Sequence, residues 1–116
     1  MLLRTVLSKN DLVSMLRRST AEWNAYRRSD PRPVDMTGID LSGVDLAGAD
    51  FSDADLQRAD LSESDLTKAN FTGANLTGAD LSWSDLRESS YVYATMSRSQ
   101  YAVFEKAQRD TVKFVD

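Results

Sequence analysis

The stretch ADLSESDLTKANFTGANLTGADL, residues 59–81, places a leucine or a phenylalanine at every fifth position. A helix turns about 100° per residue, so a step of five would scatter these side chains around its axis. A strand alternates its two faces, so a step of five would send successive side chains to opposite sides. A chain that turns a corner in every unit buries them together, and a fixed internal period is typical of a solenoid.

A second series of mostly small residues lies two positions before each leucine or phenylalanine, as Ala59 lies before Leu61. Strand spacing lets both side chains of such a pair point inward. The position between them is polar without a break from Asp35 to Glu105. All five glycines lie two positions after a central residue, where a positive φ would ease a corner. Other residues share this position, so we expect that not every corner needs a positive φ.

The unit A-[DN]-[LF]-x-x, as in ANFTG, ANLTG and ADLSW, resembles the pentapeptide-repeat family. Fourteen consecutive units fill residues 34–103. The resemblance implies an all-β solenoid, a right-handed quadrilateral β-helix with four units per coil and, here, about 3.5 coils. We therefore expect an N-terminal segment with a capping helix at residues 1–33, the β-helix at 34–105, and a C-terminal capping or dimerisation segment at 106–116.

Four units per coil would stack residues that lie twenty positions apart. Phe51, Phe71 and Tyr91 then share one column, which we interpret as an aromatic core ladder rather than a ligand site. Leucines fill the other columns of the predicted core: Leu41, Leu61 and Leu81; Leu46, Leu66 and Leu86; Leu56 and Leu76.

Residues 10–29 are predicted to be helical, and the pattern weakens near Ser19–Thr20, where two helices could meet. Asn10 is the expected N-cap, and Asp30, which precedes Pro31, is expected to end the helix. We interpret this segment as a cap over the first coil. The sequence WNAYRRSDP within it resembles a segment that precedes the repeats in some family members. The alternative is a basic face that binds an acidic partner, formed by Arg17, Arg18, Arg27 and Arg28.

The repeat fails after Phe104, because Lys106 occupies the next central position and cannot be buried without a partner. In the final TVKFV, apolar Val112 and Phe114 alternate with a lysine, as in an edge strand. This segment could cover the last coil or pair with a second subunit. Gyrase-type family members dimerise through C-terminal segments, so the resemblance favours a homodimer with Phe114 at its contact.

Large apolar side chains at outward positions are the candidate contacts on the coils. Trp83 and Val103 share a corner position twenty residues apart, and Tyr93 lies near the diagonal corner. We expect Trp83 to contact a partner. The alternative is that it packs under the C-terminal segment.

Composition excludes several classes of activity. The chain has no histidine and no cysteine, so the commonest general base and the thiolate nucleophile are missing. The aspartates lie on predicted convex walls, without the cleft that paired catalytic carboxylates or a calcium ion require. No apolar run approaches the ~20 residues of a membrane span. We expect a cytoplasmic protein that is not an enzyme and has no cofactor, metal, membrane contact or small-molecule substrate.

Charge is divided unevenly along the chain. Residues 1–33 carry seven basic groups against three acidic ones, and residues 34–103 carry twelve acidic groups against four basic ones. We therefore predict a rigid acidic scaffold that binds a protein, with no direct binding of nucleic acid. The family resemblance supplies an alternative, a DNA mimic that modulates or protects DNA gyrase or topoisomerase. A stack about 17 Å tall would span only about half a turn of DNA, which argues against it.

Overall fold

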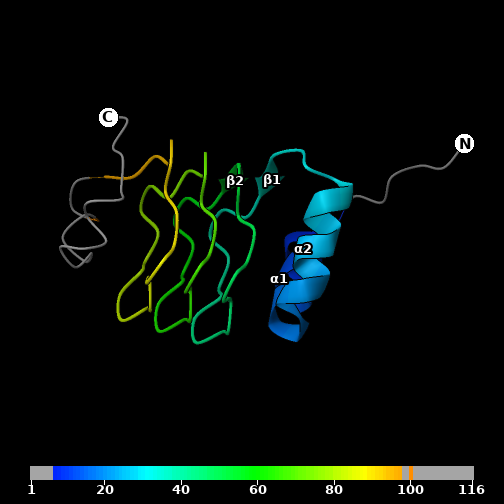
Figure 1. Cartoon of the computed structure of the whole chain (residues 1–116), viewed down its shortest axis with the longest axis horizontal. Coiled ribbons are helices and arrows are strands. Elements are labelled where there is room, and N and C mark those ends of the chain that lie inside the picture. Colours follow the sequence, from blue (N-terminus) through cyan, green and yellow to red (C-terminus); the bar gives the residue numbers. More distant parts are fainter. Residues whose placement is uncertain (1–6, 98–99, 101–116) are drawn as a thin grey trace, which may run out of the picture.

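The computed structural model of the chain describes residues 7–97 and Gln100. Two helices, α1 (Lys9–Arg18) and α2 (Thr20–Ser29), lie across one end of a stack of coils (Figure 1). The strands β1 (Val34–Asp35) and β2 (Ala54–Asp55) have two residues each, because a corner interrupts the extended chain in every five-residue unit.

Parallel pairing between residues twenty positions apart holds the coils together. β1 pairs with β2 so that Val34 lies opposite Ala54, and isolated bridges repeat this offset as far as Asn75 and Thr95. Each bridge rests on two backbone bonds, as where Leu61 N–H donates to Asp80 O at 2.8 Å. The chain is therefore a β-helix solenoid, and its offset corresponds to four five-residue units per coil.

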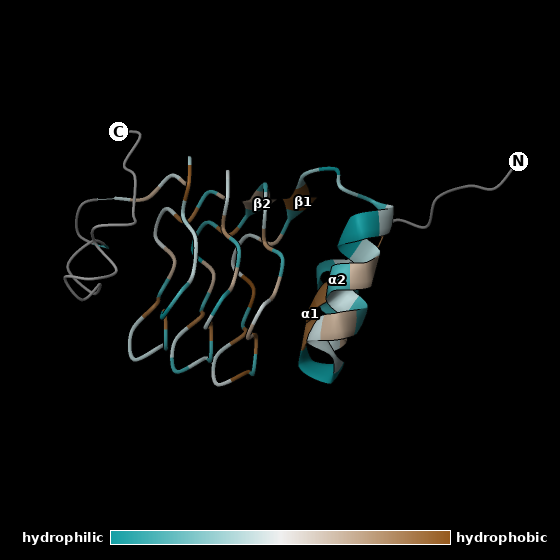
Figure 2. Ribbon diagram, viewed as in Figure 1, coloured by the Kyte–Doolittle hydropathy of each residue, from teal (hydrophilic) through white to brown (hydrophobic). Residues whose placement is uncertain are grey.

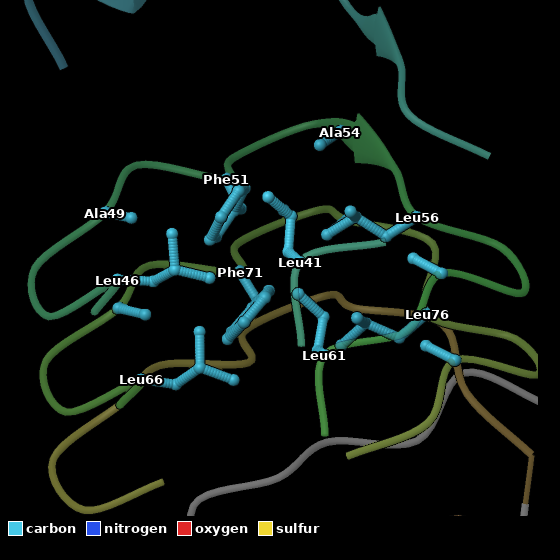
Figure 3. Packing of buried hydrophobic residues seen from close by; sticks show 14 of the residues in the cluster. Leu41, Leu46, Ala49, Phe51, Ala54, Leu56, Leu61, Leu66, Phe71 and Leu76 are labelled. Atoms are coloured by element: carbon cyan, nitrogen blue, oxygen red, sulfur yellow. The ribbon is translucent and has the colours of Figure 1, made fainter. Parts of the chain in front are cut away.

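The residues predicted for the core lie inside the coils (Figure 3). The rings of Phe51, Phe71 and Tyr91 are stacked, with centroids 5.4 and 5.3 Å apart. The leucines are also buried, each with at most 3% of its surface exposed: Leu41, Leu61, Leu81, Leu46, Leu66, Leu86, Leu56 and Leu76.

The Tyr91 hydroxyl is the polar group in this aromatic column. Ser89 Oγ donates to it at 2.7 Å, so the buried oxygen keeps a hydrogen bond. Burial disfavours the charged phenolate, and the pKa of Tyr91 is therefore raised above its usual range. Ser89, at the small inward position two residues before Tyr91, thus provides the hydrogen bond for the hydroxyl of its own unit.

Every corner from Gly38 to Tyr93 has a positive φ, so the expectation that some corners would not need one is wrong. At one such corner, Ala54 N–H donates to Phe51 O at 3.1 Å, and Asp53, the third residue of the turn, has φ 58°. A turn of this kind requires a positive φ at its third residue. Five corners use glycine, and seven use larger residues with φ between 57° and 61°: Asp53, Arg58, Glu63, Lys68, Trp83, Glu88 and Tyr93.

The N-terminal helices begin and end at polar residues. The N-cap of α1 is Ser8 rather than the predicted Asn10: Ser8 Oγ accepts from Asp11 N–H, and the Asp11 carboxylate accepts from Ser8 N–H. This capping box satisfies two of the free amides of the first turn. Ser19 has an extended backbone and separates the two helices at the predicted break. Asp30 ends α2, as predicted.

Each helix turns an i, i+4 pair toward the coils. Leu12 and Leu16 are the buried residues of α1, and Trp23 and Arg27 are those of α2. Figure 2 shows the same division in the coils, where hydrophobic and hydrophilic positions alternate along the chain. In the part of the chain that the structure describes, neither helix is long and apolar enough to cross a membrane.

Candidate functional site

The first coil has no preceding coil to satisfy its outward backbone groups, and side chains of α1 and α2 bind them instead. In a regular coil, the carbonyl at the polar position accepts a backbone N–H from the coil before it, as Asp60 O accepts from Leu41 N–H. In the first coil, helix side chains are the donors. At the polar position the pairs are Arg17 Nη2 to Asp40 O, Thr20 Oγ1 to Asp45 O, and Trp23 Nε1 to Asp50 O. Lys9 Nζ also donates to Thr37 O, one position after a central residue.

Trp23 and Asn24 bind the same side of this coil. Trp23 Nε1–H donates to Asp50 O at 2.8 Å, and Asn24 Oδ1 accepts from Asp50 N–H at 2.8 Å. The other end of the Asn24 amide donates to Gly48 O at 3.0 Å. The Trp23 ring lies 6.0 Å from Phe51 and adds a fourth aromatic to the interior column, which the repeat period does not predict.

The four arginines of the predicted basic face are not all exposed. Arg27 is only 4% exposed and donates to the backbone carbonyls of Asp30 and Ser52. The prediction that it belongs to an exposed basic face is therefore wrong. Its position, four residues after Trp23, puts it on the buried side of α2. Arg17 binds Asp40, Arg18 pairs with Glu22 at 2.7 Å, and Arg28 is exposed.

The aspartates of the walls bind their own backbone. Asp40 Oδ1 accepts from the N–H and the hydroxyl of Ser42, at 2.9 and 2.7 Å. These donors favour the charged carboxylate, so the Ser42 hydroxyl and amide lower the pKa of Asp40, and those of Ser82 lower the pKa of Asp80. Asp40 and Asp80 therefore keep their negative charge at neutral pH. Within residues 7–97 and Gln100, no three His, Cys, Asp or Glu side chains cluster in a way that could hold a metal ion.

We predict that Asp80→Asn makes stability less dependent on pH. Asn can accept the same backbone N–H, as Asn75 Oδ1 does from Thr77. Because the pKa of Asp80 is lowered in the folded state, its carboxylate stabilises the fold above the unfolded pKa, about 3.9. That contribution is lost as the pH falls through the folded pKa.

Urea unfolding at pH 7 and pH 2 measures this difference. Between the two pH values, the wild type should lose more unfolding free energy than Asp80→Asn does. The control is Glu88→Gln, which removes one charge from an exposed corner. If Asp80→Asn loses as much as the wild type, the hydrogen bonds of Asp80 do not favour its charged form.

Two aromatic side chains project from diagonal corners of the coil that runs from Leu76 to Thr95. Trp83 is 90% exposed and Tyr93 is 72% exposed, and both have φ 60°. The alternative, in which Trp83 packs under the C-terminal segment, concerns residues that the structure does not describe. Across the described chain, neither ring stacks on another aromatic. The predicted contacts Val103 and Phe114, with the C-terminal segment, lie outside the described residues.

Gln100 binds the other end of the stack. At this position of the repeat, a backbone N–H would donate to Ala79 O, as Asp80 N–H does to Ala59 O. Instead, Gln100 N–H donates to Ser97 O, and its side-chain amide donates to Ala79 O at 3.0 Å and to Leu76 O. The backbone of Gln100 therefore does not make the pairing between coils that the sequence predicts as far as Glu105. Glutamine fits the polar pattern of this position, so the sequence contains no signal for the change.

Comparisons with known proteins agree with this architecture. A family model for pentapeptide repeats matches residues 34–62 and 54–90. A comparison with curated proteins gives no match.

Three solved structures of pentapeptide repeat proteins are similar to the chain. One, from the cyanobacterium Nostoc, is involved in heterocyst differentiation regulation; it is 33% identical over 53% of this chain and 32% of its own, with a TM-score of 0.39. Another, from Cyanothece, is 26% identical over 55% and 60%, with a TM-score of 0.39. A third, from the thylakoid lumen of Arabidopsis thaliana, is 33% identical over 59% and 55%, with a TM-score of 0.32. The chain thus spans less than two thirds of the length of each of these proteins. On the match of the family model to its repeats, the chain belongs to the pentapeptide-repeat family.

Proposed function

We propose that this chain is a non-enzymatic scaffold that binds a protein partner through the corners of its β-helix. In this proposal the solenoid is a right-handed, four-sided β-helix that α1 and α2 cap at its N-terminal end. The C-terminal segment completes the other end or pairs two copies. The scaffold acts in the cytoplasm.

Trp83 is the observation that carries this proposal. A left-handed backbone costs an L-residue about 1–2 kcal/mol, and a bulky side chain at this φ is uncommon. The indole is 90% exposed, so burial within the fold offsets little of that cost. Tryptophan and tyrosine contribute strongly to protein interfaces, because each buries a large area with little loss of conformational freedom.

The backbone and the core residues around Trp83 also support a role in binding a partner. Glu63 N–H donates to Ser82 O at 2.9 Å, which ties the backbone next to Trp83 to the coil before it. Leu81 and Leu86, on either side of this corner, are each 3% exposed and fix the turn from inside. A side chain on such a rigid frame loses little backbone entropy when a partner binds.

A role without catalysis is consistent with the acidic walls. General acid–base catalysis by two carboxylates needs environments that separate their pKa values. Here Asp40, Asp80 and Asp85 all have a lowered pKa for the same reason, hydrogen bonds from the residue two positions ahead. Equivalent, charged carboxylates suit an acidic binding surface.

The DNA-mimic alternative draws on the same walls, where the lowered pKa values of Asp40 and Asp80 keep these two carboxylates charged at neutral pH. A gyrase supercoiling assay separates the two functions. A DNA mimic inhibits supercoiling at micromolar concentration or protects the enzyme from a quinolone. A scaffold for another partner does neither.

Trp83→Ala is expected to remove partner binding without unfolding the protein. The exposed indole contributes little to stability, so the free energy of unfolding should change by less than about 0.5 kcal/mol. The measurement is quantitative capture of proteins from host lysate on the immobilised wild type and variant, together with a thermal melt of each. A protein retained by the wild type should be depleted at least about tenfold on Trp83→Ala.

Arg58→Ala is the matched control, because Arg58 is also an exposed corner residue with φ 59°. This variant should retain the same proteins as the wild type. If Trp83→Ala retains them equally well, Trp83 is not the contact. If Trp83→Ala instead loses several kcal/mol of stability, Trp83 supports the fold rather than a partner.

A further inference from the structure

The corner that carries Trp83 also carries a carboxylate in the preceding coil. Glu63 lies twenty positions before Trp83 and is exposed. The backbone of Glu63 has φ 57° and that of Trp83 has φ 60°, so the two side chains start from equivalent turns. Adjacent coils lie about 4.8 Å apart, the spacing of paired strands. The third residue of this column is Gly43, which adds no side chain that could cover Glu63 from the other side.

The acidic groups around this corner differ in whether they already have a cationic partner. Asp85 is paired with Arg87 at 2.6 Å, and Glu88 lies 4.0 Å from Lys68. Glu63 makes no ion pair with any residue that the structure describes. The carboxylate next to the exposed indole is therefore open to a cation from outside the coils.

We propose that Trp83 and Glu63 form a binding site for an arginine side chain presented by the protein partner. This inference rests on the proposed scaffold function and specifies the chemistry that its corner recognises. A guanidinium can stack on the face of an indole and also donate to a carboxylate in its own plane. Lysine can do either but lacks the planar fork, so arginine should bind more tightly.

Charge complementarity favours this occupant over an acidic or neutral one. Residues 34–103 carry twelve acidic and four basic groups, so the field around the coils attracts a basic segment. An acidic segment would meet Glu63 and the charged aspartate walls. A neutral apolar segment would use the indole alone and would desolvate the Glu63 carboxylate without pairing it.

The probes for a test are three capped peptides, GRGRG, GKGKG and GQGQG, added to the 15N-labelled full-length protein. The indole N–H signals report on the two tryptophans separately, because Trp23 is buried and bonded to Asp50 O while Trp83 is exposed. GRGRG should shift the Trp83 signal in a saturable manner and leave the Trp23 signal in place. GKGKG should bind several-fold more weakly, and GQGQG should not bind.

Glu63→Gln and Glu88→Gln form a matched pair, since each removes one negative charge from an exposed corner. Glu63→Gln should raise the dissociation constant for GRGRG about fivefold. Glu88→Gln should change it by less than about twofold. Equal effects of the two variants would show general charge attraction and overturn the proposal, as would equal binding of GQGQG.

The same experiments separate this inference from the scaffold function. If Trp83→Ala loses its partner but the peptides do not discriminate, the scaffold stands and the arginine site is wrong. If Trp83→Ala keeps all its partners, the scaffold function through this corner fails, whatever the peptides show.

Discussion

Leu66→Lys is expected to abolish the cooperative folding of the β-helix. The Leu66 side chain is fully buried, and its N–H donates to Asp85 O at 2.8 Å. A lysine at this position could reach solvent only if the hydrogen bonds between the coils broke, because the side chains of the coils above and below fill the surrounding interior. An ammonium group held there would lose its hydration without a counter-charge, which costs far more than the few kcal/mol of a marginally stable domain.

Far-UV circular dichroism during heating measures this effect. Leu66→Lys should show no cooperative transition, whereas Leu66→Met should melt normally with a loss below about 1.5 kcal/mol, because it conserves volume and apolarity. A cooperative melt of Leu66→Lys near the wild-type temperature would show that this position is not interior.

Trp23→Ala should cost about 3–5 kcal/mol of unfolding free energy, as expected for a fully buried tryptophan. The change removes the ring that lies 6.0 Å from Phe51 and leaves a space above the aromatic column. It also leaves Asp50 O without its 2.8 Å indole donor. Both losses fall on the first coil, which has no other coil on that side.

Trp23→Phe separates the two contributions. It keeps most of the ring but not the donor, so it should cost about 1–3 kcal/mol for the unsatisfied Asp50 carbonyl. The small loss of ring volume adds to this cost. Urea unfolding measures both variants, and hydrogen exchange of the Asp50 amide should accelerate most in Trp23→Ala. Equal stabilities of Trp23→Ala and the wild type would mean that neither the packing of the indole nor its hydrogen bond stabilises the first coil.

The two end coils of a solenoid need stabilising contacts that its inner coils do not need. The backbone groups of each inner coil are paired with equivalent neighbouring coils, whereas an end coil presents backbone groups and apolar interior to solvent. In this chain, side-chain amides bind both ends of the ladder: Asn24 accepts from Asp50 N–H, and Gln100 donates to Ala79 O. Both act as substitutes for a missing peptide group.

The interior was predictable from the sequence because it depends on a repeated local rule. A central Leu or Phe, a small residue two positions earlier and a polar residue between them recur in phase, so Phe51, Phe71 and Tyr91 had to share a column once four units made a coil. The outward direction of Trp83 and Tyr93 follows from the same phase.

The corners and the ends required the structure. Seven larger residues have the same positive φ as the glycines, because closing a five-residue unit imposes that turn whatever side chain is present. The sequence does not show this, since aspartate, lysine and tryptophan have no obligatory turn conformation. The four arginines before the coils also look alike in sequence, yet Arg27 is buried and Arg28 is exposed.

The sequence by itself determined the period, the inward and outward faces, the two helices and the acidic walls, because each depends on residues close together in the chain. Only the tertiary structure showed that Trp23, Asn24 and Gln100 bind the two ends of the ladder. These contacts join residues twenty or more positions apart. They depend on which backbone groups the stack leaves without a neighbour, and that is a property of the assembled coils.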